Sequence, residues 1–365
     1  MVKRRPTIAD VARRAGVSKG AVSYALNGRP GIAEATRRRI LEAADALGWR
    51  PSHRGRSLSV SRAFTLGLVV ARDPALLGSD PFFPTFIAGV ESLLAERGQA
   101  LVLQVVAEGE AEAESYRRLA RDGRVDGVFL TDLRRNDPRI DLVAELGLPA
   151  VTLNRPDQPS PFPAVCVDDR PGIQEAVEHL VGLGHTRIAH VAGPEEYLHG
   201  HGRCEAFRAA MAEHGLPATL VDVADFTAAG GMAATRRLLG SPDRPTAIVY
   251  ANDQMAIAGI SVAQGLGIQI PDELSVTGYD DTELAAHIHP PLTTVRQDVF
   301  SWGQVAARTL LALIEGETTA DVHLEPAQLV VRQSTAQSQS RDEQSDPRDN
   351  PARVPSPHHS PSEET

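Results

Sequence analysis

The stretch TIADVARRAGVSKGAVSYALNG, residues 7–28, restricts the fold of its region more than any other part of the chain. Apolar side chains recur at helical spacing on either side of Gly16, which tolerates the left-handed backbone of a tight turn. Thr7 and Ser18 stand where two helices would begin, because their side chains can bond free backbone N–H groups, and Asn27-Gly28 would end the second helix. The pattern predicts two short helices around a tight turn, with these side chains inward: Ile8, Val11, Ala12, Ala15, Val22, Ala25 and Leu26.

The second of these helices leaves Lys19, Gly20, Ser23 and Tyr24 on its outward side. In a helix-turn-helix domain on DNA, the second helix lies in the major groove, so these four residues would face the bases. A third helix from about Glu34 to Leu47 would complete a small core, with these side chains inward: Ile40, Leu41, Ala44 and Leu47. We therefore expect residues 1–50 to form a three-helix DNA-binding domain, although the stretch alone would also suit an ordinary helical hairpin.

Charge separates this region from the rest of the chain. Residues 1–62 carry fourteen Lys and Arg against four Asp and Glu, a net charge of +10, whereas the whole chain has a net charge of −10. Contacts with phosphates release counterions and favour the basic region on DNA, while the acidic remainder is repelled by it. The charge distribution therefore supports a nucleic-acid partner for the N-terminal region.

A polar and basic segment, residues 51–63, follows and contains one isolated leucine, Leu58. A single exposed leucine usually has no role. Between a DNA-binding domain and the body, however, a hinge helix that folds on DNA would insert Leu58 between base pairs of the minor groove. We expect residues 51–63 to be this hinge and linker.

The body of the chain alternates short apolar runs with helical stretches, for example a helix near residues 85–97. The predicted strands are residues 66–70, 100–106, 125–130, 150–154, 187–192, 247–251 and 274–278. Such alternation indicates parallel sheets with helices on both faces. A proline-rich crossover at residues 154–169 divides the pattern into two successive units, so the expected fold class is α/β, with two lobes over residues 64–333.

Polar side chains follow several of the predicted strands, where open α/β sheets bind their ligands. Asn154 ends one strand, Asn252-Asp253 follows another, and Asp280-Asp281 follows a third. We expect these side chains to project into one cleft between the lobes. The fold alone would equally suit an extracytoplasmic solute-binding protein, but the N-terminus lacks the apolar segment of a signal peptide.

Five separate motifs resemble the LacI/GalR family of bacterial transcription regulators over residues 6–333. They are TIADVARRAGVSKGAVSYALNG, GWRPSHRGRSLS, DPFF, ANDQMAIAGI and PDELSVTGYDDTELAAHIHPPLTTVRQD. The resemblance implies a helix-turn-helix domain of three helices, a hinge helix and a two-lobed effector domain like that of periplasmic binding proteins. It also implies that ligand entry closes the lobes and changes the affinity for DNA.

The resemblance assigns roles to individual residues. Arg203, Asn252 and Asp280 would bond the hydroxyls of an effector, with Gln297 and Asn154 nearby, and this chemistry favours a sugar. The predicted effector set is completed by aromatic rings: Phe226 against the effector, and Phe82 and Phe83 either lining the cleft or packing beneath it. Lys19 would contact guanine, and the other expected DNA-binding residues are Thr7, Ser18, Gly20, Ser23, Tyr24, Asn27, Arg29 and Leu58. Asn154, Gly20 and Tyr24 depart from residues common in the family, so neither the sugar nor the operator can be copied from a relative.

Other classes of protein find little support in the sequence. Glycine-rich nucleotide motifs and nucleophile motifs are missing, so we expect neither an enzyme nor a cofactor. The pairs His199/His201 and His287/His289 are interpreted as loop histidines rather than metal ligands. Because no run approaches the roughly 20 apolar residues of a membrane helix, a cytoplasmic location without membrane contact is expected. Cys166 and Cys204 are interpreted as buried small side chains rather than disulfide partners.

Residues 334–365 turn to Ser, Gln, Asp, Pro and His, which predicts a disordered tail. The tail contains no leucine, and hence no heptad helix that would join dimers, so a homodimer is expected. The sequence thus predicts a ligand-responsive transcription regulator that acts as a repressor and binds a palindromic operator as a dimer. Two alternatives remain: a regulator controlled by a protein partner, and a cytosolic small-molecule-binding protein without operator function.

Overall fold

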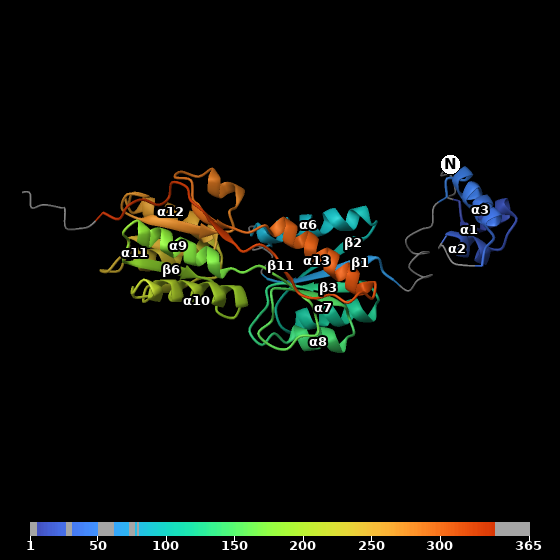
Figure 1. Cartoon of the computed structure of the whole chain (residues 1–365), viewed down its shortest axis with the longest axis horizontal. Helices are drawn as coiled ribbons and strands as arrows, with labels where there is room; N and C mark the ends of the chain where they lie inside the picture. The colour runs from blue at the N-terminus through green and yellow to red at the C-terminus, as the bar shows by residue number, and fades with distance from the viewer. Residues whose placement is uncertain (1–5, 27–30, 50–61, 73–76, 79, 340–365) are drawn as a thin grey trace, which may run out of the picture. The chain divides into compact units, whose positions relative to one another are not determined.

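The computed structural model describes residues 6–26, 31–49, 62–72, 77–78 and 80–339. The chain divides into two compact units, each assembled from separate segments. Unit 1 comprises residues 1–169, 195–202 and 297–327, and unit 2 comprises residues 170–194, 203–296 and 328–365. The three N-terminal helices have their own core and are described separately (Figure 1).

The N-terminal domain contains α1 (Ile8–Ala15), α2 (Lys19–Leu26) and α3 (Glu34–Ala46), as the periodicity predicted. Its buried side chains are small: Val11, Ala12, Ala15, Val22, Ala25, Ile40, Ala43 and Ala44. The prediction that Leu41 points inward is wrong, because Leu41 is 48% exposed. Leu41 lies about 100° around the helix from Ile40 and therefore points away from the core. Ala43 and Ala44 are the buried residues of the next turn.

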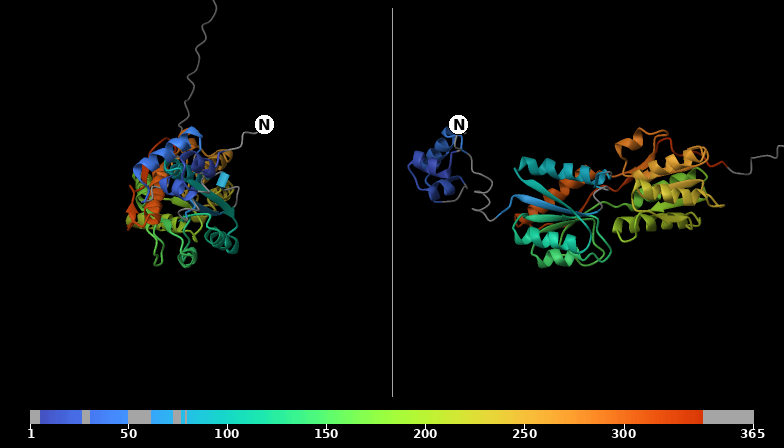
Figure 2. Two further views of the ribbon diagram at one scale, coloured as in Figure 1. Left: turned by 90° about the vertical axis from the view of Figure 1, so that its right-hand side faces the viewer. Right: turned by 180° about the vertical axis from the view of Figure 1, so that it is seen from behind.

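Unit 1 is built on a parallel sheet with the strand order β11-β5-β4-β3-β1-β2. Its strands are β1 (Thr65–Ala71), β2 (Ala100–Val106), β3 (Gly127–Leu130), β4 (Ala150–Leu153), β5 (Ala164–Cys166) and β11 (Val322–His323). Its helices are α6 (Phe82–Glu96), α7 (Glu110–Arg121), α8 (Arg139–Glu145) and α13 (Val299–Ile314). Side chains alternate across β1, so that Leu66 and Leu68 join the core with α6 and α13, while Val69 joins the core with α7 and α8. Helices therefore cover both faces of this sheet (Figure 2).

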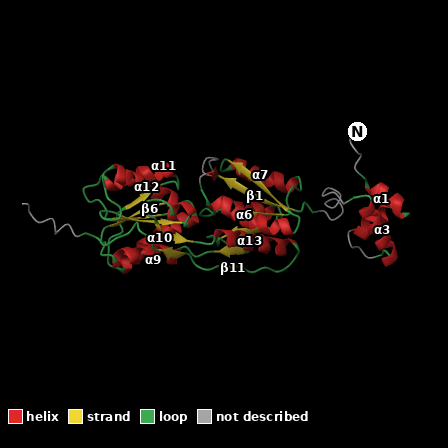
Figure 3. Ribbon diagram, turned by 90° about the horizontal axis from the view of Figure 1, so that it is seen from above, coloured by secondary structure: helices red, strands yellow, loops and turns green. Residues whose placement is uncertain are grey.

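Unit 2 repeats the plan, with helices around a central sheet (Figure 3), and its strand order is β12-β10-β9-β8-β6-β7. Its strands are β6 (Ile188–Ala192), β7 (Val221–Val223), β8 (Ala247–Tyr250), β9 (Ser275–Tyr279), β10 (Thr293–Arg296) and β12 (Gln328–Val330). Its helices are α9 (Arg170–Gly182), α10 (Leu198–Glu213), α11 (Ala228–Leu239), α12 (Asp253–Gly265) and the 3-10 helix η1 (Glu283–Ala286). The first residues of α10 are grouped with unit 1. The neighbouring strands pair in parallel, except that β12 is antiparallel to β10.

The α/β class with parallel sheets is confirmed, and each of the seven predicted strand ranges contains or overlaps a strand. The predicted succession of the two units is wrong in one respect. After β10 the chain contributes α13 and β11 to unit 1 and then returns to unit 2 with β12. The segment 297–327 carries the apolar side chains of α13, among them Trp302 and Leu310, which complete the core of unit 1.

Residues 335–338 do not follow the prediction of a disordered tail. The Ala336 amide donates to Ser275 Oγ at 3.0 Å, and the Ser338 amide donates to the Leu183 carbonyl at 2.8 Å. Polar composition alone overlooked these bonds, because they depend on partners far away in the sequence. Residues 340–365 lie outside the described residues.

Candidate nucleic-acid interface and effector site

The α1–α2 pair has the geometry of a helix-turn-helix. Gly16 adopts a φ of +64°, and the Val17 amide donates to the Ala12 carbonyl at 3.0 Å, which closes the turn. The Asp10 carboxylate accepts from both the amide and the hydroxyl of Thr7, at 2.9 and 2.7 Å. Ser18 Oγ accepts from the Ala21 amide at 3.1 Å, so the predicted cap of the second helix is present. The two helix starts are thus fixed by local hydrogen bonds.

The outward side of α2 is as the sequence predicted. Lys19, Gly20 and Tyr24 are exposed, and Ser23 is half-buried. Further exposed cations on the same domain are Arg13, Arg14, Arg38 and Arg39. An ammonium group and a phenol ring on a short exposed helix are suited to base edges and phosphates. Asn27, Arg29 and Leu58 lie outside the described residues, and their roles stay predictions.

Four of the predicted effector residues lie together in unit 2. Arg203 donates to the Ala251 carbonyl at 2.7 Å, and its guanidinium carbon lies 3.6 Å from the ring centroid of Tyr279. Asn252 donates from Nδ2 to the Phe226 carbonyl at 2.9 Å. Asp280 follows Tyr279 directly, and its amide donates to the Val295 carbonyl at 2.8 Å. The carboxyl ends of β7, β8 and β9 therefore bring an aromatic residue, an amide and a carboxylate into one group with the Arg203 guanidinium of α10.

Burial separates these four side chains into two kinds. Arg203, Phe226 and Asn252 are each 6% exposed, whereas Asp280 is half-buried. Asn252 caps α12, because its Oδ1 accepts from the Met255 amide at 2.9 Å. The ring of Phe226 fills the space at Gly193, where an added Cβ would lie 2.0 Å from Phe226 Cζ. Much of the predicted site is thus also part of the packing of unit 2.

Backbone conformation marks the same strand ends. Asp132, Asn154, Phe226 and Asp280 have φ values of +48°, +67°, +65° and +109°. Each lies within three residues of the carboxyl end of a strand: β3, β4, β7 and β9. Residues other than glycine rarely adopt such a backbone, and where they do the strain is often retained for a ligand site. Both sheets therefore carry strained residues where parallel α/β sheets bind ligands.

In unit 1, the predicted effector residues have different surroundings. Phe83 is 2% exposed and belongs to the core, so it packs in the interior rather than lining a cleft. Phe82 is half-buried, with its ring centroid 5.9 Å from that of Trp302. Asn154 Oδ1 accepts from the Val167 amide at 2.8 Å, and Gln297, which precedes α13, is 9% exposed.

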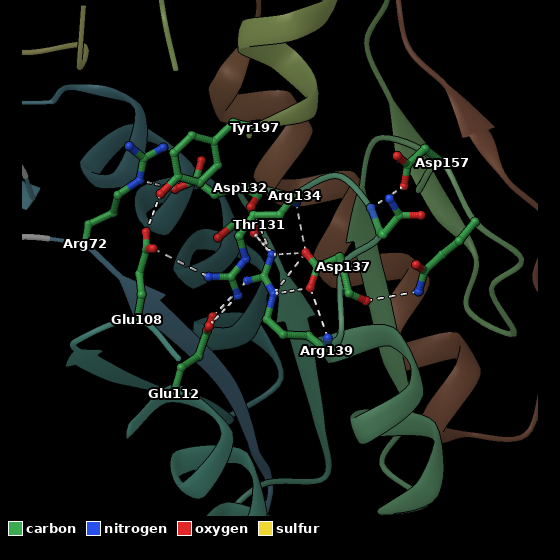
Figure 4. Close-up of polar contacts among 12 residues, drawn as sticks. Arg72, Glu108, Glu112, Thr131, Asp132, Arg134, Asp137, Arg139, Asp157 and Tyr197 are labelled. Atoms are coloured by element: carbon green, nitrogen blue, oxygen red, sulfur yellow. Dashed lines mark hydrogen bonds and ion pairs between the residues drawn. The ribbon is translucent and has the colours of Figure 1, made fainter. Parts of the chain in front are cut away.

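A group of polar side chains in unit 1 was missed by the sequence analysis (Figure 4). Arg72 follows β1, and its Nε donates to Asp132, which follows β3, at 2.9 Å. The ring centroid of Tyr197 lies 3.9 Å from the Arg72 guanidinium carbon, and the Tyr197 hydroxyl donates to Glu108. Asp132 and Tyr197 border a polar pocket of about 10 Å³, with room for about one water molecule, together with Glu112, Thr131, Arg134 and Arg139.

Arg139 lines this pocket and bonds the backbone next to it. It is 4% exposed, pairs with Asp137 at 2.6 Å and with Glu112 at 3.1 Å, and donates to the carbonyls of Thr131 and Asp132 at 2.9 Å. Because it bonds the backbone around Asp132, Arg139 fixes the strained conformation of that residue. A buried arginine with this many acceptors is fully compensated.

The charges of this cluster are stable near neutral pH. Burial alone would raise the pKa of Asp132, but the charge and hydrogen bond of Arg72 bring the pKa below its usual value. Burial would lower the pKa of Arg139, but Asp137 and Glu112 more than offset it, and the pKa is raised. Asp132 is therefore an ionised acceptor paired with a fixed cation, an arrangement that suits hydroxyl groups of an uncharged ligand.

The rule that found Asn252 and Asp280 could also have found Arg72 and Asp132, since both follow strands. Tyr197 carried no such signal, because it lies in the segment 195–202 that is grouped with unit 1 although its neighbours belong to unit 2. His199 and His201 lie in the first turns of α10 and not in a loop, while His287 and His289 follow η1.

Within the described ranges, no group of three or more His, Cys, Asp or Glu side chains could hold a metal ion. Over the same ranges, no helix has the length and apolar character to cross a bilayer. Cys166 and Cys204 are both buried and are not joined in a disulfide, as predicted.

Comparison with known proteins gives a consistent result. Residues 7–52 match the description "Bacterial regulatory proteins, lacI family", and residues 177–335 match "Periplasmic binding protein-like domain". The HTH-type transcriptional regulator CelR of Thermobifida fusca is 36% identical over 340 residues, which cover 91% of this chain and 99% of that protein.

Two solved structures resemble the chain over most of its length. The transcriptional regulator CelR-cellobiose complex has a TM-score of 0.69 at 36% identity, covering 90% of this chain and 100% of that one. The lac repressor dimer bound to operator and the anti-inducer ONPF has a TM-score of 0.79 at 29% identity, covering 91% and 100%. With its helix-turn-helix, its paired α/β sheets and this similarity, the chain belongs to the LacI family of bacterial transcription regulators.

Proposed function

We propose that this regulator binds a near-palindromic DNA operator as a homodimer, and that a carbohydrate effector changes its affinity for DNA. The observation that carries the proposal is the presence in one chain of an exposed outward side of α2 that carries Lys19 and of strained strand ends in both units. Similarity over most of its length to a regulator solved with cellobiose supports the carbohydrate effector. Such a protein acts where bacterial DNA is, in the cytoplasm.

On DNA, Lys19 would contact a guanine edge, while Ser23 and Tyr24 would contact bases or phosphates. Lys19 is the exposed cation at the start of α2, where a recognition helix approaches the base edges. Phosphate contacts would come from Arg29 and the cluster at residues 37–39. These contacts set the affinity, whereas Lys19 sets the sequence preference.

For the effector, we propose contacts in each unit. In unit 2 the ligand would bond Arg203, Asn252 and Asp280 next to Phe226. In unit 1 it would meet Phe82, Asn154 and Gln297, together with Arg72, Asp132 and Tyr197. Guanidinium forks, planar amides and carboxylates match vicinal hydroxyls.

Homodimer formation is supported by the edge of the unit 1 sheet. β2 is the last strand in the sheet order, its sequence is ALVLQVV, and each of its residues is half-buried or exposed. An apolar edge strand of this length is a template for pairing with another chain. The lac repressor that the chain resembles was solved as a dimer. Sedimentation of the full chain should give twice its monomer mass, and a monomer at micromolar concentration would contradict the proposal.

The first experiment selects binding sites for the full chain from a randomised DNA duplex library. The selected DNA should contain an inverted repeat, and log affinity should fall linearly with log salt, with a slope of several units. Failure to enrich any sequence would refute operator binding and would leave a binding protein without operator function.

The second experiment adds cellobiose and other neutral disaccharides to the selected duplex and follows fluorescence anisotropy. We expect at least one sugar to change operator affinity by about tenfold or more, which is about 1.4 kcal/mol of coupling. Arg203→Ala should keep operator binding and lose the response. A wild-type protein that binds its operator but responds to no sugar would refute the carbohydrate effector and favour control by a protein partner.

A further inference from the structure

Asp253, the first residue of α12, has a buried carboxylate that accepts hydrogen bonds from residues outside its own helix. Its side chain is completely buried, so the prediction that it projects into a cleft beside Asn252 is wrong. Oδ2 accepts from the Thr282 amide at 2.8 Å, and Oδ1 accepts from Thr294 Oγ1 at 2.5 Å. The carboxylate therefore ties α12 to the turn after β9 and to β10.

Capping of α12 does not explain this carboxylate. Asn252 is the N-cap residue and its Oδ1 accepts from the Met255 amide. Asp253 lies one position further on, and its two oxygens accept from Thr282 and Thr294, which lie outside the helix. A buried carboxylate is costly unless it is hydrogen-bonded, so its retention here points to the turn that it contacts.

That turn, residues 280–282, contains two strained residues. Asp280 and Asp281 have φ values of +109° and +50°. The Asp280 amide donates to the Val295 carbonyl, and the Asp281 carboxylate accepts from Arg296 and Arg332, each at 2.5 Å. Such a backbone persists only when several contacts hold it together.

The fit beneath the turn is close. A Cβ added at Gly278 in β9 would lie 2.2 Å from Asp253 Oδ1, so the carboxylate lies directly against the strand backbone two residues before Asp280. A side chain at Gly278 would displace the carboxylate, starting with Oδ1 and its bond from Thr294. The position of Asp253 thus depends on β9, and the position of the turn depends on Asp253.

We propose that Asp253 is a positioning residue, whose carboxylate holds the turn 280–282 in the conformation that presents Asp280 to the effector. The inference rests on the proposed function, because Asp280 is an effector contact only under that proposal. Removing the carboxylate frees the Thr282 amide and lets the two strained residues relax. Asp280 then loses its fixed orientation, and effector affinity falls while the DNA-binding domain is untouched.

The test compares three variants of the full chain with wild type. Asp253→Ala removes both acceptors, and Asp253→Asn keeps an oxygen for the Thr282 amide and a donor for Thr294. Thr235→Ala is the matched control, because Thr235 is equally buried in unit 2 but bonds Tyr250 Oη and the Gly231 carbonyl, away from the turn.

Hydrogen exchange gives a readout that needs no ligand. In Asp253→Ala, the amides of Asp280 and Thr282 should exchange at least about tenfold faster, the equivalent of one lost hydrogen bond. In Asp253→Asn and Thr235→Ala, their exchange should stay near that of wild type. Unchanged exchange at these amides in Asp253→Ala would overturn the proposal, whatever the effector is.

Titration with cellobiose gives the functional readout. Asp253→Ala should weaken cellobiose binding about tenfold or more, while operator affinity without sugar changes less than about twofold. Asp253→Asn should restore most of the affinity. Faster exchange with unaltered cellobiose affinity would overturn the positioning role. Absence of cellobiose binding by wild type would instead refute the choice of effector, and the exchange result would then decide the inference about the turn.

Discussion

Replacing Asp253 by asparagine should stabilise unit 2 at alkaline pH and leave its stability nearly unchanged at acid pH. Burial raises the pKa of Asp253 from its usual 3.8 to about 6. The folded state therefore binds this proton more tightly than the unfolded state. Asparagine is nearly isosteric with aspartate and carries no charge at any pH, so the variant removes the titration and the charge and keeps the shape of the side chain.

The magnitude follows from the size of the pKa shift. A shift of about two units is worth about 3 kcal/mol, at about 1.4 kcal/mol per unit. The stabilising contribution of protonated Asp253 is complete below pH 4 and is lost as the pH rises through about 6. At pH 8, the free energy of unfolding of the variant should thus exceed that of wild type by up to about 3 kcal/mol. The loss of a negative charge at the start of α12 reduces this gain by up to about 1 kcal/mol.

Thermal unfolding of both proteins at about pH 4 and pH 8 measures this difference. Wild type and variant must be compared at each pH, because the titration of His190 changes the free energy of unfolding with pH in the opposite direction. Burial lowers the pKa of His190 to about 4, so its contribution to stability is present above pH 6.5 and is lost as the pH falls through 4. His190 is present in both proteins and cancels. A variant that is less stable than wild type by the same amount at both pH values would refute the reasoning.

Three further substitutions, one of them with a matched control, test other parts of the structure. Lys19→Ala should weaken binding to the selected operator by about 1–3 kcal/mol and relax one base position in anisotropy titrations, whereas equal weakening on all duplexes would contradict base contact. Gly89→Ala should lower the melting temperature, since the new Cβ would lie 2.1 Å from the Phe300 carbonyl oxygen between α6 and α13. The control Gly182→Ala, at an exposed helix end with open space, should be neutral or stabilising. Asp132→Asn should weaken sugar binding about tenfold in calorimetry with little effect on operator affinity, and an unchanged sugar affinity would remove Asp132 from the effector site.

The strands that the sequence predicted share a physical property. β1, β2 and β8 are apolar runs between turn residues, and such runs indicate strands without knowledge of their neighbours. β7, β11 and β12 are two or three residues long and only partly buried, and β10 reads TTVR. Their strand conformation depends on pairing partners distant in sequence, which a local pattern does not contain.

The candidate effector residues divide in the same way. Asn252 and Asp280 were predicted because polar residues at the ends of strands reach a common edge of a parallel sheet. The burial of Asp253 could not be predicted, since its partners Thr282 and Thr294 are 29 and 41 residues away. Phe83 was left between two interpretations, and only the packing around α6 assigns it to the core. Local sequence thus identified the edge, while the division between ligand contacts and supporting residues required the tertiary structure.

At Asp280, stability and function favour different residues. The backbone conformation favours glycine, whereas the proposed effector contact requires the carboxylate. At a φ of +109°, glycine has no Cβ strain, so Asp280→Gly should stabilise unit 2 by roughly 1 kcal/mol. The same substitution removes the carboxylate that is proposed to bond the effector, so cellobiose binding should be lost while operator binding remains. The measurements are a melting curve and a sugar titration on the same preparation. A less stable variant would mean that side-chain bonds of Asp280 within the chain outweigh its strain, and a stabilised variant that still binds cellobiose would show that the strain is retained for something other than the effector.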